Sequence, residues 1–357
     1  MKRLLRKGYR MATGLRSLAA RTGGGSPRVF YGGARAGDIG GPLVKVKRLR
    51  AYFPEHRWGY NLVYCLSGAP YLPAVALRLL KRRGVPLVCN QNGVFYEAWH
   101  DGDWRARNAE MAVPYHLAGH VFWQSQFCRD SAQRFLGPRQ GPSEVLYNAI
   151  DTGHFRPADT PRVGEKFTFL VTGKIDSHMF YRIEASLKGL AAARANGLDA
   201  RLIVAGWMSS PAAAKCRDLA ATLDLGGAVS MTGPYTQEDA PAVYRSADAY
   251  LMLKHNDPCP NAVLEALACG LPVLYSDSGG VLELVGGDCG VALACAVSWQ
   301  RPHWPAPAAV AEGMRAIADN REAMAASARC RAVARFDIAP WIERHRAVFA
   351  DLLGARP

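Results

Sequence analysis

The sequence predicts an α/β fold made of two doubly wound parallel sheets. Strand-like and helix-like segments alternate over residues 28–147, and a second alternation of the same kind begins near residue 167. The chain has 357 residues, which is long enough for two domains of ordinary size. Because parallel sheets of this type bind ligands where their strands end, we expect functional residues to follow the strands.

Short apolar runs favour strands, and the longer segments between them favour helices. In the first alternation the expected strands are 28–31, 60–65, 85–89, 120–124 and 144–147, and the expected helices are 43–53, 74–82 and 127–135. In the second, the expected strands are 167–171, 200–205, 228–232, 249–253 and 273–275, and the expected helices are 182–196, 215–223, 240–246 and 262–269. The Ala-rich segment from residue 307 onward is expected to be helical.

The stretch 257–285 contains the clearest functional pattern. Pro258 and Pro260 oppose regular structure and predict a loop, and Asn261 is a suitable N-cap for the short apolar helix 262–269. A helix start attracts anions because its first backbone N–H groups have no partner within the helix.

A second anion site is predicted at the turn Ser278-Gly279-Gly280, because the backbone N–H groups of a Gly-Gly turn can bind an anion. Two carboxylates, Asp257 and Glu265, lie near these anion sites in the sequence. A ligand with both phosphates and hydroxyls suits such a combination, and a nucleotide sugar is a ligand of this kind.

This stretch resembles the acidic-x7-Glu signature of retaining glycosyltransferases of the GT-B fold, family 4, also called glycosyl transferases group 1. The matching positions, in order, are Asp257, Glu265-Ala266, Gly270-Leu271-Pro272-Val273 and Gly279-Gly280-Val281-Leu282-Glu283. Residues 148–157 resemble the segment that ends the first domain in that family. The first acid is Asp257 where the family has Glu, which shortens the reach of the carboxylate by one methylene.

The resemblance implies a GT-B architecture with an active-site cleft between two Rossmann-like domains. It implies transfer of a hexosyl or related group from a nucleotide sugar to a hydroxyl acceptor with retained configuration, the acceptor being a lipid-linked or polysaccharide glycan of the cell envelope. The expected parts are a basic tail or amphipathic helix (1–26), an acceptor-side domain (27–157), a nucleotide-sugar-binding domain (158–335) and a helix that packs back on the first domain (336–357).

Glu265 is expected to bind the ribose of the donor, since one carboxylate accepts two hydrogen bonds from a diol. Asp257 stands at the family position that faces the transferred sugar or the acceptor. A carboxylate there stabilises an oxocarbenium-like centre. The alternative for Asp257 is to hold its own loop by accepting hydrogen bonds from backbone N–H groups.

Cations are needed for the leaving diphosphate. Gly173 and Lys174 match the family's glycine and basic residue after a strand, and Arg182 fits the second basic position, with Lys188 as the reserve. The resemblance implies that this pair makes a metal unnecessary. No metal-ligand spacing is present, and no cofactor is expected because the nucleotide sugar is a substrate.

The remaining predicted contacts follow from the same resemblance. The glycine loop near the donor phosphate is assigned to Gly40 and Gly41, with 32–33 as the competing choice, and Tyr235 is assigned to the base pocket. Asn92 stands where many family members have a His that contacts the sugar, and an amide donates and accepts hydrogen bonds without charge. The expected sugar or acceptor contacts are Asn92, Gly93 and Glu97.

The net charge of +14 is concentrated at the start of the chain. Residues 1–50 contain 13 Lys or Arg and one acidic residue, Asp38, which gives +12. This local imbalance argues against nucleic-acid binding. It favours a basic amphipathic helix in residues 1–26 that lies on an anionic membrane surface, and the alternative is a mobile basic tail.

The composition favours a cytoplasmic protein, and the basic N-terminus suits a peripheral position on the inner face of the membrane. The nine cysteines are scattered without a Cys-x-x-Cys pair, and neither a secretory signal nor a run of eighteen apolar residues is found. Besides a glycosyltransferase, two other classes remain open: a nucleotide-sugar epimerase of the same fold and a catalytically inactive nucleotide-sugar-binding protein.

Overall fold

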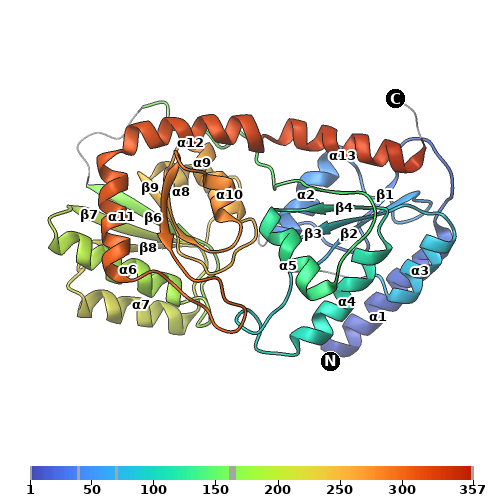
Figure 1. The fold of residues 1–357 in the computed structure, drawn as a ribbon, viewed down its shortest axis with the longest axis horizontal. Coiled ribbons are helices and arrows are strands. Elements are labelled where there is room, and N and C mark those ends of the chain that lie inside the picture. Colours follow the sequence, from blue (N-terminus) through green and yellow to red (C-terminus); the bar gives the residue numbers. More distant parts are fainter. Residues whose placement is uncertain (1, 38–40, 69–70, 161–165, 355–357) are drawn as a thin grey trace. The chain divides into compact units, whose positions relative to one another are not determined.

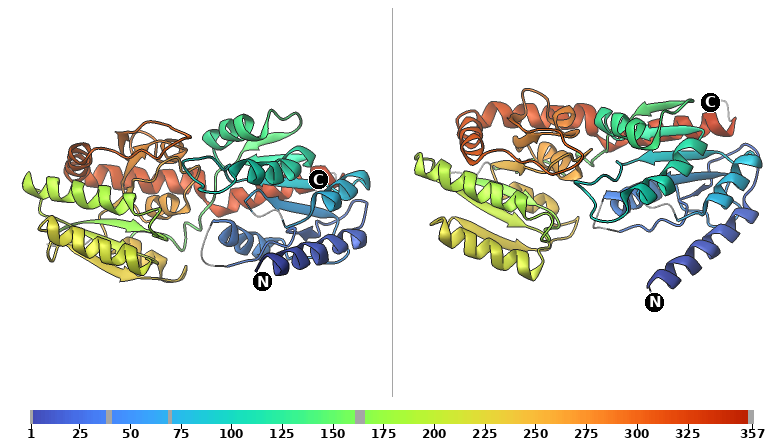
Figure 2. Two further views of the ribbon diagram at one scale, coloured as in Figure 1. Left: turned by 90° about the horizontal axis from the view of Figure 1, so that it is seen from below. Right: turned by 60° about the horizontal axis from the view of Figure 1, so that its bottom comes forward.

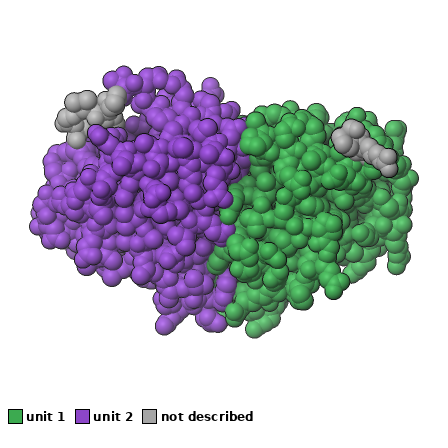
Figure 3. All heavy atoms as spheres, turned by 45° about the horizontal axis from the view of Figure 1, so that its top comes forward, with its two compact units in different colours: residues 1–147, 339–357 green, residues 148–338 purple. Residues whose placement is uncertain are grey.

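The computed structural model describes residues 2–37, 41–68, 71–160 and 166–354, and Gly40 therefore lies outside the described residues. The chain divides into two compact units. Unit 1 comprises Met1–Tyr147 and Ala339–Pro357, and unit 2 comprises Asn148–Ile338 (Figure 3). Each unit contains one parallel sheet, as the alternation in the sequence predicts.

The sheet of unit 1 has five parallel strands that follow one another in sequence order. They are β1 (Val29–Phe30), β2 (Leu62–Leu66), β3 (Leu87–Gln91), β4 (His120–Trp123) and β5 (Ser143–Val145). In β2 and β3 every residue is buried, because helices cover both faces of the sheet. Asn90 and Gln91, at the end of β3, are therefore buried polar groups beside the strand ends.

Unit 1 contains the helices α1 (Lys2–Leu15), α2 (Gly41–Tyr52), α3 (Ala74–Arg82), α4 (Trp104–Leu117), α5 (Gln126–Leu136) and α13 (Ile338–Leu353), and the 3-10 helix η1 (Arg16–Ala19). Figure 1 shows α13 on one face of the sheet and α3 and α4 on the other. Sequence analysis did not predict α4, which contains Pro114 and has no clear apolar stripe. Asp103 caps this helix by accepting a hydrogen bond from the Ala106 N–H at 2.9 Å.

α13 follows the last helix of unit 2 in the sequence but belongs to unit 1, where aromatic and polar contacts hold it. Phe349 lies edge-on to Phe53, with ring centroids 4.9 Å apart. The fully buried His345 lies 2.9 Å from the Tyr64 hydroxyl and 2.8 Å from the Trp341 carbonyl oxygen. These contacts make α13 part of the hydrophobic core of unit 1.

The N-terminal segment is helical and packs on unit 1, as Figure 2 shows. The Tyr9 hydroxyl donates to the Gly33 carbonyl at 2.6 Å, and Arg10 pairs with Glu110 at 3.0 Å. The Arg83 guanidinium donates to the Ser17 carbonyl at 2.8 Å. Of the two forms considered for this segment, a helix and a mobile tail, the structure contains the helix.

The sheet of unit 2 has six parallel strands in the order β11-β10-β9-β6-β7-β8. They are β6 (Phe167–Thr172), β7 (Ala200–Ala205), β8 (Val229–Gly233), β9 (Ala249–Met252), β10 (Val273–Asp277) and β11 (Gly290–Ala294), of which sequence analysis did not predict β11. The helices are α6 (Tyr181–Ala195), α7 (Ser210–Thr222), α8 (Ala240–Arg245), α9 (Asn261–Ala268), α10 (Val281–Val285), α11 (Pro307–Asp319) and α12 (Arg321–Phe336). α7 begins earlier than predicted because Ser209 caps it and Pro211 occupies its first turn.

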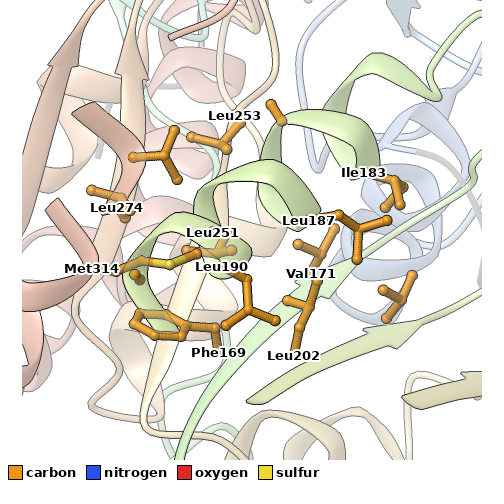
Figure 4. Packing of buried hydrophobic residues seen from close by; sticks show 14 of the residues in the cluster. Phe169, Val171, Ile183, Leu187, Leu190, Leu202, Leu251, Leu253, Leu274 and Met314 are labelled. Carbon is orange, nitrogen blue, oxygen red and sulfur yellow. The ribbon is translucent and has the colours of Figure 1, made fainter. Parts of the chain in front are cut away.

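The main apolar cluster of unit 2 lies between its sheet and the pair α6 and α11 (Figure 4). Phe169 and Val171 of β6 point into this cluster, together with Leu251 of β9. Since side chains alternate along a strand, Thr172 and Tyr250 belong to the opposite face, on which α8 and α9 lie. That face holds the polar residues of the site described next.

None of the helices within the described residues combines the length and the apolar character that crossing a lipid bilayer requires.

Candidate functional site

The predicted donor residues of unit 2 follow the ends of three neighbouring strands, β6, β9 and β10. Parallel strands end at the same edge of a sheet, so the segments that follow them meet there. An isolated bridge pairs Asp257, which follows β9, with Gly279, which follows β10. Figure 1 shows α8, α9 and α10 side by side next to this edge.

The turn at residues 278–280 lies directly against the backbone of Asp257. The Gly280 N–H donates to the Asp257 carbonyl at 2.8 Å. Gly279 has a φ of 82°, and a Cβ at this position would lie 2.5 Å from the Asp257 carbonyl oxygen. Only glycine permits this approach. The Ser278 hydroxyl accepts from the Asn256 N–H at 3.1 Å, so Ser278, Gly279 and Gly280 form one unit with the Asp257 loop.

The Asp257 carboxylate is held by two contacts within its own loop. Lys254 Nζ lies 2.7 Å from Oδ2, and the Cys259 N–H donates to Oδ1 at 3.2 Å. The loop-holding role considered for Asp257 is therefore present, and 12% of its side chain is still exposed. Sequence analysis missed Lys254, although its spacing of three residues from Asp257 is a signal that was available.

Glu265 lies on α9 among buried hydroxyl groups. Its side chain is buried, and Oε2 accepts a hydrogen bond from the Tyr244 hydroxyl at 2.8 Å. The Thr172 hydroxyl contacts the Tyr250 hydroxyl at 3.0 Å and the Tyr244 hydroxyl at 3.3 Å. Burial, with the Glu265 carboxylate as the next cause, raises the pKa of Tyr235. The Tyr235 hydroxyl therefore lies near the Glu265 carboxylate, and the donor roles of both residues stay predictions.

The prediction that Asn261 is the N-cap of its helix is wrong. Pro260, with φ −71° and ψ 121°, occupies the cap position without a side-chain hydrogen bond, and Asn261 is the first helical residue. Among the described residues Asn261 Oδ1 is buried and has no hydrogen-bond partner. The first turn of α9 therefore contains a buried acceptor atom in place of a side-chain cap.

Gly173 and Arg182 lie together after β6. The side chain of Arg182 is buried, and its Nη2 donates to the Thr172 carbonyl at 3.3 Å. A Cβ on Gly173, which has a φ of 132°, would lie 3.6 Å from Arg182 Nη1. Lys174 Nζ instead lies 5.0 Å from the ring centre of Trp207. The reserve residue, Lys188, is paired with Glu184 at 2.7 Å on the surface of α6.

In unit 1 the predicted sugar or acceptor residues follow β3. Asn92 Oδ1 accepts from Gln124 Nε2 at 2.6 Å, and the Gly93 carbonyl accepts from Gln91 Nε2 at 2.6 Å. The Glu97 side chain is exposed, and Gly41 is the exposed first residue of α2.

Sequence analysis missed a buried cation beside Asn90, which lies at the end of β3. Lys45 Nζ donates to Asn90 Oδ1 at 2.6 Å, and Gln124 Nε2 donates to the same oxygen at 3.0 Å. The backbone N–H of Asn92 donates to the Ser67 hydroxyl at 2.8 Å. This network fixes the amide side chains at the carboxyl ends of the unit 1 strands.

Metal binding was not expected from the sequence. Over the described ranges, no group of three or more His, Cys, Asp or Glu side chains is placed to hold a metal ion. Independence from metal stays a prediction, which transfer assays in the presence of a chelator would test.

Comparison with known families gives two matches that follow one another along the chain. Residues 13–154 match the model described as Glycosyltransferase Family 4, and residues 156–301 match the model described as Glycosyl transferases group 1. The second match contains every predicted donor residue of unit 2, from Gly173 to Gly280.

Sequence relatives are similar over short stretches. A D-inositol 3-phosphate glycosyltransferase from Salinispora arenicola is 38% identical over 68 residues, which cover 19% of this chain and 15% of that protein. A protein of the same name from Pseudarthrobacter chlorophenolicus is 28% identical over 119 residues, covering 33% and 28%. The chain thus matches less than a third of the length of each of these relatives.

Solved structures are similar over most of the chain. The Anabaena Alr3699/HepE structure in complex with UDP has a TM-score of 0.65 at 16% identity, and the match covers 87% of this chain and 82% of that one. Sucrose-phosphate synthase from Thermosynechococcus elongatus has a TM-score of 0.65 at 17% identity, covering 88% and 78%. At such identities these likenesses establish the fold. Together, the two consecutive family matches and this fold show that the chain belongs to the GT-B glycosyltransferases of family 4, group 1.

Proposed function

We infer that the protein transfers a sugar from a nucleotide-sugar donor to a hydroxyl acceptor with retention of configuration. One observation supports this most strongly: the buried Glu265 carboxylate accepts from the Tyr244 hydroxyl, which contacts Thr172, the residue whose carbonyl accepts from the buried cation Arg182. Solved structures of the same fold contain UDP, and one contains UDP-glucose, which supports a nucleotide sugar as the donor.

Glu265 binds the ribose diol in this proposal. The Tyr244 hydroxyl already donates to Oε2 at 2.8 Å and fixes the orientation of the carboxylate. Charge-assisted hydrogen bonds of this kind are stronger than those between neutral groups. Because the Glu265 carboxylate is already oriented, it loses little conformational entropy when the diol binds. Its hydrogen bonds to the diol therefore add to the affinity for the donor.

The diphosphate is bound by the Gly279 N–H of the 278–280 turn and by the cations after β6, since the Ser278 and Gly280 N–H groups already donate to the Ser276 and Asp257 carbonyls. Arg182 is buried and oriented by the Thr172 carbonyl, whereas Lys174 lies over Trp207 nearby. As the bond to the sugar breaks, negative charge grows on the leaving diphosphate. A fixed cation then stabilises the transition state more than the ground state.

Asp257 acts at the reacting sugar. Its carboxylate keeps a fixed position because Lys254 and the Cys259 N–H bind one oxygen each. A fixed negative charge stabilises the oxocarbenium-like centre that forms when the leaving group departs. No metal takes part in the proposed transfer, since Arg182 and Lys174 supply the positive charge that the leaving diphosphate needs.

Hydrolysis of the donor tests the proposal without knowledge of the acceptor. The protein is incubated with UDP-glucose, UDP-galactose, UDP-N-acetylglucosamine and GDP-mannose, and products are followed by NMR. Slow release of one sugar with the anomeric configuration of its donor is expected, with release reduced in Asp257→Asn. Conversion of the donor to its epimer would indicate the epimerase instead, and binding without any turnover would indicate the inactive binding protein.

We also propose that unit 1 binds an anionic membrane, which fits a lipid-linked or polysaccharide glycan as the acceptor near Asn92, Gly93 and Glu97. The exposed apolar residues of the N-terminal helices support this: Met11, Leu15 and Leu18 are 72%, 62% and 64% exposed. They lie in the part of the chain with the +12 imbalance. Apolar side chains beside basic ones suit the interface of an anionic bilayer.

Vesicle binding tests the membrane proposal. Replacing Met11, Leu15 and Leu18 by Gln should release the protein from vesicles that contain phosphatidylglycerol, because the apolar contribution to binding is lost. Val333→Gln, on α12 of unit 2 and 45% exposed, is the matched control. If the triple variant and the control sediment equally with vesicles, this surface does not bind the membrane.

A further inference from the structure

A loop between β11 and α11 lies over the segment that contains the signature acid. Residues 295–306 have no regular secondary structure, yet they are joined to the segment 255–257 and to the start of α6 by several contacts. Neither the family signature nor the donor residues described above include this loop. Its contacts place an exposed tryptophan, Trp304, beside the proposed site of reaction.

The two residues before Asp257 anchor the 295–306 loop. The Ser298 carbonyl accepts from His255 Nε2 and from Asn256 Nδ2, both at 2.9 Å, and the His303 N–H donates to His255 Nδ1 at 3.3 Å. His255 thus donates from one ring nitrogen and accepts at the other, which only the neutral imidazole can do. Burial lowers the pKa of His255 and so favours this neutral form.

Trp304 stacks on Tyr181, the first residue of α6. Their ring centroids are 5.4 Å apart and their planes are inclined by 25°. The Tyr181 hydroxyl accepts from the His255 N–H at 3.1 Å, which fixes this ring too. The charges of Arg182 and Asp257 both act on the Tyr181 hydroxyl, so the aromatic pair lies near the proposed phosphate cation and the proposed catalytic carboxylate.

Trp304 is 46% exposed although one of its faces lies on Tyr181. Its free surface is therefore the opposite face and the edge. A large exposed aromatic ring, oriented by a stacked partner and set beside charged groups, is typical of a ligand site and not of an ordinary protein surface.

We propose that Trp304 contacts the sugar ring of the donor and contributes to sugar selectivity. A pyranose has hydroxyls around its rim and an apolar face of C–H groups, which an aromatic face covers, while Asp257 accepts hydrogen bonds from the rim. In the proposed pose the ribose lies at Glu265 and the base at Tyr235, so the contact with Trp304 adds affinity only for a donor that carries a sugar. This inference rests on the proposed function, since it assumes that a nucleotide sugar binds in unit 2.

Calorimetry with matched ligands tests the inference. Wild type, Trp304→Ala and Trp304→Phe are titrated with UDP, UDP-glucose, GDP and GDP-mannose, and the affinity ratio of each nucleotide sugar to its nucleotide is compared. Trp304→Ala should lower this ratio roughly three- to tenfold, the range of one aromatic contact, with nucleotide affinity unchanged. Trp304→Phe keeps an aromatic face and should restore most of the ratio.

Trp58→Ala is the matched control, because Trp58 is 63% exposed and belongs to unit 1. An unchanged ratio in Trp304→Ala would overturn the inference. So would an equal loss of affinity for nucleotide and nucleotide sugar, since that shows a structural role of the loop. If neither nucleotides nor nucleotide sugars bind the wild-type protein, the proposed function itself is contradicted. That result differs from one in which they bind wild type and Trp304→Ala equally well, which contradicts only the inference about Trp304.

Discussion

Asp257 and Lys254 form a pair whose geometry matters for catalysis. Lys254 Nζ lies 2.7 Å from Oδ2, and both side chains are mostly buried. A misplacement of a catalytic group by about 1 Å can cost roughly a hundredfold in rate. The orientation that Lys254 gives to Asp257 is therefore part of the proposed mechanism, although Lys254 touches neither nucleotide nor phosphate in it.

Replacing Lys254 by Met should lower the rate of donor hydrolysis by about tenfold or more, because Asp257 loses the partner that orients it. Nucleotide affinity should change by less than about twofold, since the nucleotide is bound by other residues. Initial-rate assays and calorimetry measure the two quantities. Lys166→Met, which removes a surface pair with Asp199, is the control. Equal losses of rate and nucleotide affinity would show that Lys254 acts on the donor directly.

At this scale the sequence identifies the residues of a pattern but not their neighbours in space. The order of Asp257, Glu265 and the 278–280 turn was sufficient to predict a common site, and the structure brings Asp257 and the turn together. The hydroxyl that holds Glu265 belongs to Tyr244, on another helix, so only the fold reveals it.

The prediction that Asn261 is an N-cap failed because the backbone of Pro260 is already extended at the cap position, which places Asn261 inside the helix.

α11 packs closely against α6 at Gly189 and against the sheet at Gly313. A Cβ on Gly189 of α6 would lie 2.2 Å from Val310 Cγ1, and a Cβ on Gly313 of α11 would lie 2.5 Å from Leu274 Cδ1. Contacts this short require movement of the surrounding atoms. α11 can therefore lie close to α6 and to the sheet only where side chains are absent.

Gly189→Ala should reduce the free energy of unfolding by about 1–3 kcal/mol, the range for overpacking a core, despite the better helix propensity of alanine. Denaturant titration followed by circular dichroism measures it. Gly226→Ala is the control, because a Cβ there has no neighbour within 4 Å. A stability equal to that of wild type or higher would mean that the helices separate at no cost.

Elements with a strong pattern could be predicted from the sequence, and those without one could not. β6 and β9 are apolar runs and were found, whereas the helix α4 lacks an apolar stripe and has Pro114 near its end. β11 was missed because its residues are small and partly exposed, and its pairing with β10 defines it as a strand. Register and neighbouring strands supply information that a local pattern does not contain.

For the molecule as a whole, the pH dependence of stability follows in part from His345 in unit 1. Burial lowers the pKa of this fully buried imidazole from 6.5 to about 3. Below pH 6.5 the unfolded chain therefore binds a proton that the folded chain does not, so the free energy of unfolding falls as the pH is lowered from 6.5 toward 3. Above pH 6.5 both forms are neutral and the contribution is constant.

His345→Gln should reduce this dependence, because glutamine does not titrate. The difference in the free energy of unfolding between pH 7 and pH 4, measured by denaturant titration, is expected to be smaller in the variant than in wild type. His154→Gln, at an exposed position of unit 2, is the control and should leave the difference unchanged. An equal pH dependence in His345→Gln and wild type would show that the imidazole is protonated in the folded protein.

The central claim is that Glu265 binds the ribose of the donor. Calorimetry of Glu265→Ala with UDP and GDP tests it most directly, with Glu312→Ala, an exposed carboxylate of α11, as the control. The account predicts that Glu265→Ala weakens binding of the nucleotide that wild type prefers by about 2–4 kcal/mol, or roughly 30- to 1,000-fold, while Glu312→Ala has no effect. Equal affinity for that nucleotide in Glu265→Ala, Glu312→Ala and wild type would contradict the account.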